Sequence, residues 1–389
     1  MYFFLRSIFS QFFINAFMMV RIWRSKMIPQ YLKYFLILLY GAETTLYFVA
    51  LFGAQRLPTT FLKFAQHLSG IWVFFNIYLL VLILLFDIFW WLKNNKNLFP
   101  KMRAKTGIYL QCLFITAFFV LLGTEVKISC DNYLTPSEIS LTQEYNKKEN
   151  SSNEPIATYK IVVASDFHLG YLIDKASLSK YVKQINAHKP DIIVLNGDLI
   201  DHSLRPLIQA KMNEELSLLH APKGVYFIPG NHEYKFNHDI KFEWIRNSGI
   251  QVLRDSVANI DNKLLIVGRD DRSREEIEEA KGEEGDKRLP IADLMERVDL
   301  LMPVVFFAHQ PGDIKEASEY NLPLVICGHT HQGQVFPVNI ISKFLYKNDY
   351  GYKKIGETST YTSSGIGFSG FPIRIGTDSE ILILTIKIY

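Results

Sequence analysis

Two histidines, His329 and His331, stand one residue apart directly after the apolar segment 322–327. Imidazole nitrogens are frequent ligands of zinc, iron and similar ions. At the tip of a buried strand, held between Gly328 and a small hydroxyl residue, the two rings can face two neighbouring ions. A His-x-His pair also occurs on ordinary protein surfaces, so this pair alone leaves a metal site and a structural role equally open.

Other side chains that bind metals follow four predicted strands upstream. The strands at 160–164, 191–195, 224–228 and 304–307 are followed, respectively, by Asp166 and His168, by Asp198, by Asn231, His232 and Glu233, and by His309. Open α/β sheets collect ligands at the carboxyl ends of their strands. Such mixed nitrogen and oxygen donors suit manganese, iron, zinc or cobalt, and the two oxygens of Asp198 can bridge two ions. Any one of these residues alone would more often be a turn residue, but the repetition predicts a metal site.

Short strands alternating with amphipathic helices must position these residues from about residue 159 onward. Leu178, Tyr181, Val182 and Ile185 recur at helical spacing, and a second apolar stripe covers 204–219. Further strands are expected near 251–253 and 264–267. The charged segment 269–297 is either a solvated helix and loop or a cap over a substrate site. The pattern predicts an α/β domain over residues 158–389.

The first 124 residues have a different, strongly apolar composition. Segments 34–54, 68–92 and 107–124 approach or exceed the roughly 20 residues that a membrane-spanning helix needs. A fourth segment, 7–20, is short and contains Gln11 and Asn15, so it either spans the bilayer or lies in its interface. We therefore expect residues 1–124 to form a helical transmembrane region of three or four spans, followed by a polar linker at 125–157.

Basic residues in the short loops predict the orientation of this region. They form two sets, Arg21, Arg24, Lys26 and Lys33, and then Lys93, Lys96, Lys101, Arg103 and Lys105. The positive-inside rule places both sets in the cytoplasm. With three or with four spans, the α/β domain then lies outside the cytoplasm, anchored to the cell membrane.

Charged residues within the predicted spans raise one further possibility. Intramembrane carboxylates are costly and often functional. Glu43, near the middle of its span, would serve transport or lipid handling, or make a hydrogen bond inside the bundle, whereas Asp87 is expected to reach the interface. The three cysteines have no ligand spacing, and no basic patch with interleaved aromatic residues suggests a nucleic-acid partner.

In chain order, the five strand-end blocks read Asp-x-His, Gly-Asp, Gly-Asn-His-Glu, His and Gly-His-x-His. This series resembles the calcineurin-like metallophosphoesterase superfamily over about residues 160–389. Segments 331–334, 363–367 and 372–376 resemble its bacterial membrane- or envelope-associated branch, some members of which are described as UDP-2,3-diacylglucosamine-hydrolase-like. The resemblance implies a four-layer α/β/β/α sandwich, here preceded by the transmembrane bundle.

The resemblance also implies roles for individual residues. It assigns Asp166, His168, Asp198 and His331 to one divalent metal ion, and Asp198, Asn231, His309 and His329 to a second. Two such ions lower the pKa of a shared water, which attacks phosphorus. His232 would act as the general acid, oriented by Asp201. The Arg-Gly that follows this Asp in phosphoprotein phosphatases is replaced here by His202 and Ser203, so a protein phosphatase is not expected.

The sequence thus favours a membrane-anchored, two-metal hydrolase of phosphomonoesters or phosphodiesters. Its expected partners are membrane lipids and a phosphate-ester substrate linked to a lipid or to the envelope. Two alternatives stay open at this point. One is a metal-binding scaffold without catalysis, and the other is a transporter or lipid-handling protein with a regulatory phosphoesterase domain.

Overall fold

The computed structural model describes residues 2–26, 28–53, 56–96, 126–128, 136–146, 154–275, 287–370 and 372–389. The chain divides into two units by its internal contacts. One comprises Met1–Val126 with Gly370–Pro372, and the other comprises Lys127–Ser369 with Ile373–Tyr389. The predicted span 107–124 lies outside the described residues, as do Cys112, Cys130 and the basic residues Lys101, Arg103 and Lys105.

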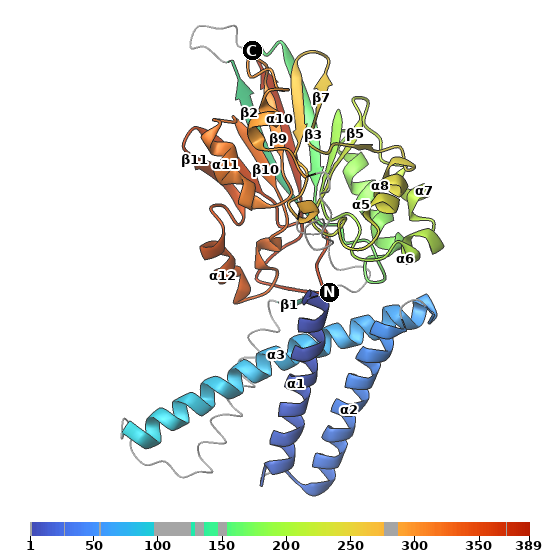
Figure 1. The fold of residues 1–389 in the computed structure, drawn as a ribbon, viewed down its shortest axis with the longest axis vertical. Coiled ribbons are helices and arrows are strands. Elements are labelled where there is room, and N and C mark those ends of the chain that lie inside the picture. Colours follow the sequence, from blue (N-terminus) through green and yellow to red (C-terminus); the bar gives the residue numbers. More distant parts are fainter. Residues whose placement is uncertain are drawn as a thin grey trace. The chain divides into compact units, whose positions relative to one another are not determined.

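Three helices make up the described part of the first unit: α1 (Tyr2–Arg24), α2 (Gln30–Phe52) and α3 (Thr59–Lys96) (Figure 1). By length and composition alone, α2 and residues Thr59–Phe89 of α3 qualify as membrane-crossing helices. They cover residues 34–52 of the predicted span 34–54 and residues 68–89 of the predicted span 68–92. The segment 7–20 lies within α1, which is not among the candidate spans found in the described residues.

Polar side chains bridge these helices. Asn15 of α1 donates to Glu43 and Thr44 of α2 over 3.1 and 2.8 Å. Glu43 is therefore buried and accepts a hydrogen bond inside the bundle, which is the second of the two roles considered for it from the sequence. Asp87 is half-exposed and accepts two bonds from Arg21, at 2.5 and 2.7 Å. The carboxylate of Asp87, which was expected to reach the membrane interface, thus forms an ion pair with Arg21 that joins α3 to α1.

The second unit contains two six-stranded sheets. The first has the order β2 (Ser137–Tyr145), β14 (Glu380–Ile388), β3 (Ala157–Ala164), β4 (Ile192–Asn196), β5 (Val225–Ile228) and β6 (Gln251–Val252). The second has the order β11 (Gly351–Ile355), β12 (Thr358–Thr362), β10 (Leu324–Cys327), β9 (Val304–Phe307), β8 (Leu264–Gly268) and β7 (Ser256–Ile260). Two short strands, β1 (Val126–Ile128) and β13 (Ile373–Ile375), lie outside these sheets.

Helices cover the outer face of each sheet. The first sheet carries α5 (Lys175–Ala187), α6 (Arg205–Gln209), α7 (Met212–Leu216) and α8 (His238–Arg246), and the second carries α10 (Ile291–Met295) and α11 (Ile314–Glu319). The other helical elements in the described part of this unit are η1 (Pro311–Asp313), η2 (His331–Gly333) and α12 (Val338–Leu345).

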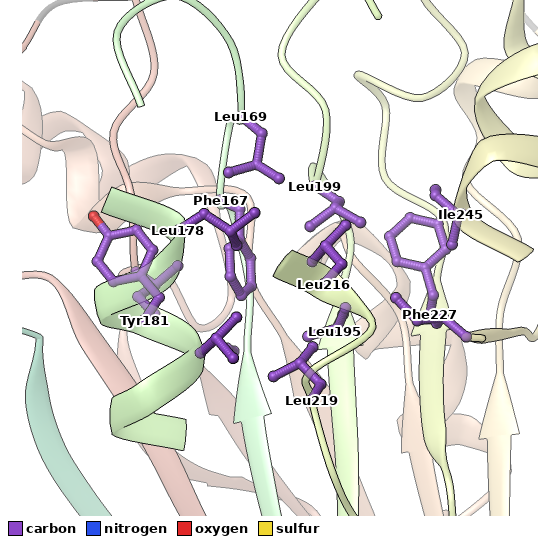
Figure 2. Close-up of a cluster of buried hydrophobic side chains, with 14 of the residues drawn as sticks. Phe167, Leu169, Leu178, Tyr181, Leu195, Leu199, Leu216, Leu219, Phe227 and Ile245 are labelled. Carbon is purple, nitrogen blue, oxygen red and sulfur yellow. The ribbon is translucent and has the colours of Figure 1, made fainter. Parts of the chain in front are cut away.

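Strand alternation explains how three separate cores arise. In β4, Ile193 and Leu195 face the helices, whereas Ile192 and Val194 face the other sheet. Because every second side chain points to the opposite face, one wholly apolar strand can line two cores. Figure 2 shows the helix-facing core, in which Tyr181 of α5 lies beside Phe167. The four-layer α/β/β/α sandwich that the family resemblance implied is confirmed.

Strand β2 lies inside the segment 125–157 that was expected to be a linker. Among the described strands it lies at the edge of its sheet, where it pairs with β14 in parallel register. Six of its nine residues are polar, and five of these six are exposed. That composition resembles a linker, because an edge strand with a solvated face lacks a continuous apolar run.

Candidate dinuclear metal centre

The predicted ligands lie at one edge of the second unit because the strands that carry them are parallel. Strands β3, β4 and β5 are parallel in the first sheet, and β8, β9 and β10 are parallel in the second. Asp166 and His168 follow β3, Asp198 follows β4, Asn231 follows β5, His309 follows β9, and His329 and His331 follow β10. Parallel strands end at the same edge of a sheet, so these loops meet.

One group of possible ligand atoms comes from Asp166, His168 and His331, which all lie within 4.8 Å of one another. The Nε2 atoms of His168 and His331 are 3.1 Å apart, and Nε2 of His331 is 3.4 Å from Oδ1 of Asp166. All three side chains are buried. Two imidazole nitrogens and a carboxylate converging at this spacing have the donor chemistry of a transition-metal site.

A second group comes from Asp198, His309 and His329, again within 4.8 Å. Nε2 of His309 is 3.2 Å from Oδ2 of Asp198, and the same oxygen is 3.7 Å from Nε2 of His168. Asp198 therefore lies between the two groups, as a bridging ligand must. Nδ1 of His309 is 2.8 Å from the carbonyl oxygen of Asn196, so this nitrogen carries a hydrogen and Nε2 is the atom that can bind an ion once it has lost its proton.

Three buried atoms of the second group support its fit to a cation. Among the described residues, Oδ1 of Asn231, Nε2 of His309 and Nδ1 of His329 make no hydrogen bond. Buried polar atoms are nearly always satisfied by protein, water or an ion. A divalent cation held by these atoms and by Asp198 would satisfy all of them.

His232 and Asp201 lie beside the two groups. Nδ1 of His232 is 2.6 Å from the carbonyl oxygen of Asp201 and 3.1 Å from its Oδ1. Nε2 of the same ring is 3.9 Å from Oδ2 of Asp198 and so faces the metal ligands. The second carboxylate oxygen of Asp201 pairs with Nδ1 of His202 at 2.8 Å. Burial lowers the pKa of His232 to about 4, although the carboxylates of Asp198 and Asp201 act in the opposite direction.

Charges within the second group are strongly coupled. Burial disfavours the charged forms of both Asp198 and His309. The nearby His309 and His232 nevertheless hold the pKa of Asp198 well below its usual value. Asp198 and Asp166 in turn raise the pKa of His309 well above its usual value, despite burial. A cation binding at Nε2 of His309 must displace this proton, so cation affinity is expected to rise with pH.

The backbone at these residues is unusual. Five predicted ligands have positive φ angles: Asp166 (59°), His168 (48°), Asp198 (51°), His329 (72°) and His331 (50°). Such conformations are uncommon outside glycine and cluster at functional sites. Glycine makes the close packing possible, since a Cβ on Gly230 would lie 2.4 Å from the backbone nitrogen of Asp198.

Glu233 belongs to the Gly-Asn-His-Glu block, but its sequence gave no reason to assign it a role. The structure shows its carboxylate accepting backbone N–H bonds from Asp198 (3.0 Å), Ile200 (3.0 Å) and Gly230 (2.9 Å). Glu233 is fully buried and joins the loop after β4 to the loop after β5. It thereby fixes the backbone at Asp198 and two residues after it.

Arg374 is a second residue whose position the sequence did not predict. Its side chain is fully buried and donates to the carbonyl oxygens of Ser364 (2.8 Å) and Gly367 (2.5 Å). The same nitrogen is 3.3 Å from Nδ1 of His331. The segment 372–376 marked this region as a motif, but only the fold shows that the guanidinium lies behind a possible metal ligand.

The described ends of the charged segment 269–297 are anchored by ion pairs. Arg288 contacts Asp313 at 3.0 Å and Arg274 contacts Asp270 at 3.0 Å. Asp271 is buried and accepts two bonds from Gln310, the residue after His309. Residues 276–286 lie outside the described part of the chain, so the choice between a solvated loop and a cap stays a prediction.

Known proteins with similar sequences are described as phosphoesterases that use metal ions. Residues 159–333 match the family model described as "Calcineurin-like phosphoesterase". The chain is 31% identical over 232 residues to an uncharacterized metallophosphoesterase from Aquifex aeolicus, covering 59% of this chain and 85% of that protein. An uncharacterized metallophosphoesterase from Campylobacter jejuni is 30% identical over 357 residues, covering 87% of this chain and 88% of the relative.

A vertebrate protein is also similar. A "Transmembrane protein with metallophosphoesterase domain" from Danio rerio is 29% identical over 245 residues, which is 60% of this chain. The match spans only 54% of the length of that protein, about half of it. The similarity to the Campylobacter jejuni protein, in contrast, extends over most of both chains.

Proposed function

This chain belongs to the calcineurin-like metallophosphoesterase family, and on that premise we propose that it is a membrane-anchored hydrolase of phosphomonoesters or phosphodiesters that uses two divalent cations. The observation that carries this proposal is the convergence of the two ligand groups on Asp198, whose Oδ2 is 3.2 Å from His309 and 3.7 Å from His168. A site with this bridging geometry is suited to hold two ions side by side.

The proposed ligands of one ion are Asp166, His168, Asp198 and His331, and those of the other are Asp198, Asn231, His309 and His329. When bound, two such ions would supply a water of lowered pKa and neutralise charge on the phosphoryl oxygens. The nitrogen and oxygen donors suit manganese, iron, zinc or cobalt. The positive φ angles of five of these residues set the directions in which their Cα–Cβ bonds leave the backbone, which reduces the backbone rearrangement that binding requires.

His232 is proposed to donate the proton that the leaving oxygen needs. Its Nδ1 is held by Asp201, which leaves Nε2 directed toward Asp198 and the reacting phosphoester. Because burial lowers the pKa of His232 to about 4, the ring is neutral at pH 7 before substrate binds. The negative charge of a bound phosphoester favours the protonated ring, so proton uptake is expected to accompany binding.

The substrate is proposed to be lipid- or envelope-linked, and the catalytic unit to lie outside the cytoplasm. Two membrane-length helices support an anchored enzyme, as does the basic-residue pattern of the loops. Acylated, nucleotide-linked sugars such as those cleaved by UDP-2,3-diacylglucosamine hydrolases are one candidate class. His202 and Ser203 depart from the protein phosphatase pattern, so phosphoprotein substrates are disfavoured.

Two alternatives have less support. A scaffold without catalysis would have no use for His232, which is nevertheless buried beside the ligands and hydrogen-bonded to Asp201. A transport role for the helical unit was suggested by Glu43, whose bond from Asn15 gives it a structural explanation.

Substitutions in the full-length, detergent-solubilised protein test the proposal. Removing a general acid typically costs about 10²- to 10⁴-fold in rate. His232→Ala and Asp198→Asn should therefore each lower manganese-dependent hydrolysis of bis(p-nitrophenyl) phosphate and p-nitrophenyl phosphate by at least about 100-fold. His220→Ala is the matched control, since that histidine is exposed, and it should keep wild-type activity. Full metal-dependent activity in the His232 or Asp198 variant would refute the mechanism.

A further inference from the structure

Helix α12 presents its apolar side chains to the outside. Ile341, Phe344 and Leu345 are 52, 84 and 71% exposed, whereas Ser342 between them is only 5% exposed. A surface helix of a soluble domain normally does the reverse, with its apolar stripe facing the core and its polar residues facing water. In α12 the apolar side faces outward and the polar side faces the domain. A contiguous exposed apolar face of this kind marks an interaction surface.

Hydrogen bonds hold the helix in this orientation. Ser342 donates to the carboxylate of Asp349 at 2.8 Å, and Thr330 donates to the backbone carbonyl of Asp349 at 2.7 Å. Packing is tight as well, because a Cβ on Gly333 would lie 2.4 Å from the backbone nitrogen of Asn339. The polar side of α12 is thus attached to the loop that contains His329 and His331.

The exposed apolar face lies close to the candidate metal centre. The ring of Tyr346, the residue after α12, is 6.5 Å from that of His329. On another side of the centre, Phe236 is 72% exposed and its ring is 6.4 Å from His202, which is itself 5.3 Å from His232. Figure 1 shows α12 at the end of the sandwich opposite the C-terminus, which is the end where β3, β4 and β5 terminate.

The charge around α12 indicates which partner it fits. Lys343 within the helix and Lys347 and Lys353 beyond it are exposed. A helix with large apolar residues on one side and lysines at its border is typical of segments that lie in the interface of an anionic bilayer. The same chain carries two helices of membrane-spanning length, which would keep a bilayer at high effective concentration.

We propose that α12 inserts its apolar face into the bilayer interface and holds the candidate metal centre at the level of the lipid headgroups. Ile341, Phe344 and Leu345 would lie among the acyl chains, with Lys343 and Lys347 at the phosphates. Resting on the proposed function, a second step follows: the enzyme takes its phosphoester from the membrane, as the headgroup of an amphiphile. The first step stands without the second.

Depth-dependent quenching tests the first step. The full-length protein carrying Cys112→Ser and Cys130→Ser is given a single labelling site at Phe344→Cys, because the remaining Cys327 is buried. Leu301→Cys is the control, since this residue is 91% exposed and lies before β9, at the edge away from the centre. Both are labelled with bimane and reconstituted in phosphatidylcholine–phosphatidylglycerol vesicles that contain nitroxide-labelled lipid.

The bimane at position 344 should be quenched several-fold more strongly than that at position 301. Equal quenching at the two positions would overturn the proposal. Weak quenching at 344, together with a disulfide between two copies of the unlabelled Phe344→Cys protein on oxidation, would instead assign the face to a second copy of this chain, and would also refute bilayer docking.

Activity separates the second step from the first. Ile341→Glu with Phe344→Glu should lower hydrolysis of an acylated p-nitrophenyl phosphodiester in vesicles by about tenfold or more, while bis(p-nitrophenyl) phosphate in water is hydrolysed at the wild-type rate. Leu301→Glu should change neither rate. Equal loss on both substrates, or no loss on the vesicle substrate, would refute delivery from the membrane. A wild-type protein that cleaves neither probe would refute the proposed function while leaving the quenching result to decide docking.

Discussion

Replacing Glu233 by glutamine should weaken metal binding while keeping the shape of the side chain. In the wild-type protein, one carboxylate oxygen accepts N–H bonds from Asp198 and Gly230, and the other accepts one from Ile200. A carboxamide has only one oxygen. If that oxygen keeps the first two bonds, the new NH₂ group faces the N–H of Ile200, and two donors oppose each other in a buried site.

The size of the effect follows from these bonds. A hydrogen bond to a charged group contributes about 1.5–3 kcal/mol, and a buried donor without an acceptor costs about 1–3 kcal/mol. The loss is shared between the stability of the unit and the placement of Asp198. Since about 1.4 kcal/mol corresponds to a tenfold change in affinity, manganese should bind roughly 10- to 100-fold more weakly. The maximal rate at saturating manganese should stay within a few-fold of wild type, because no proposed ligand is removed.

Calorimetric titration of metal-stripped, full-length protein with manganese measures the affinity. Burial and the charge of Asp198 raise the pKa of Glu233 to about 7, so the titration is made at pH 8, where the wild-type side chain is charged. Glu243→Gln on α8 is the matched control, because that glutamate is exposed. Wild-type affinity in the Glu233 variant, even with a lower melting temperature, would refute a positioning role for this residue.

Two other buried side chains give predictions for stability. Arg374→Met leaves several buried carbonyl oxygens without a donor, so it should lower the free energy of unfolding by about 3 kcal/mol, or the melting temperature by roughly 6–12 °C. Arg246→Met is the control, because Arg246 is exposed. An unchanged melting temperature in the Arg374 variant would contradict this account. Burial lowers the pKa of Lys241 to about 8, so the folded state binds fewer protons than the unfolded state between pH 8 and the ordinary lysine range. Stability should therefore rise with pH across that window, and Lys241→Met should flatten the rise in melting temperature; equal slopes in both proteins would refute it.

The sequence predicted the strands and the ligands because both depend on local patterns. Strands such as β4 are continuous apolar runs, and polar residues such as Asp198 follow them directly. Once parallel pairing is assumed, the strand ends must meet, and the structure brings Asp166, His168, Asp198, His309, His329 and His331 into two groups. The helical spacing of Leu178, Tyr181, Val182 and Ile185 predicted the buried face of α5 for the same reason.

Features that depend on long-range contacts could not be predicted in this way. Glu233 and Arg374 bond backbone groups that are distant in the chain, and no spacing in the sequence reports such bonds. In the same way, only the structure shows that the polar residue Ser342 of α12 is buried while Phe344 of the same helix faces outward.

The position of β14 affects the order in which the domain can fold. This strand lies between β2 and β3, although its residues follow those of every other strand of the two sheets in the chain. During synthesis, β2 and β3 emerge early with the edges that β14 will cover still unpaired. Such edges can pair with other chains, so the growing domain is exposed to this kind of aggregation until residue 388 has been made. A C-terminal fusion that delays docking of β14 would prolong this exposed stage.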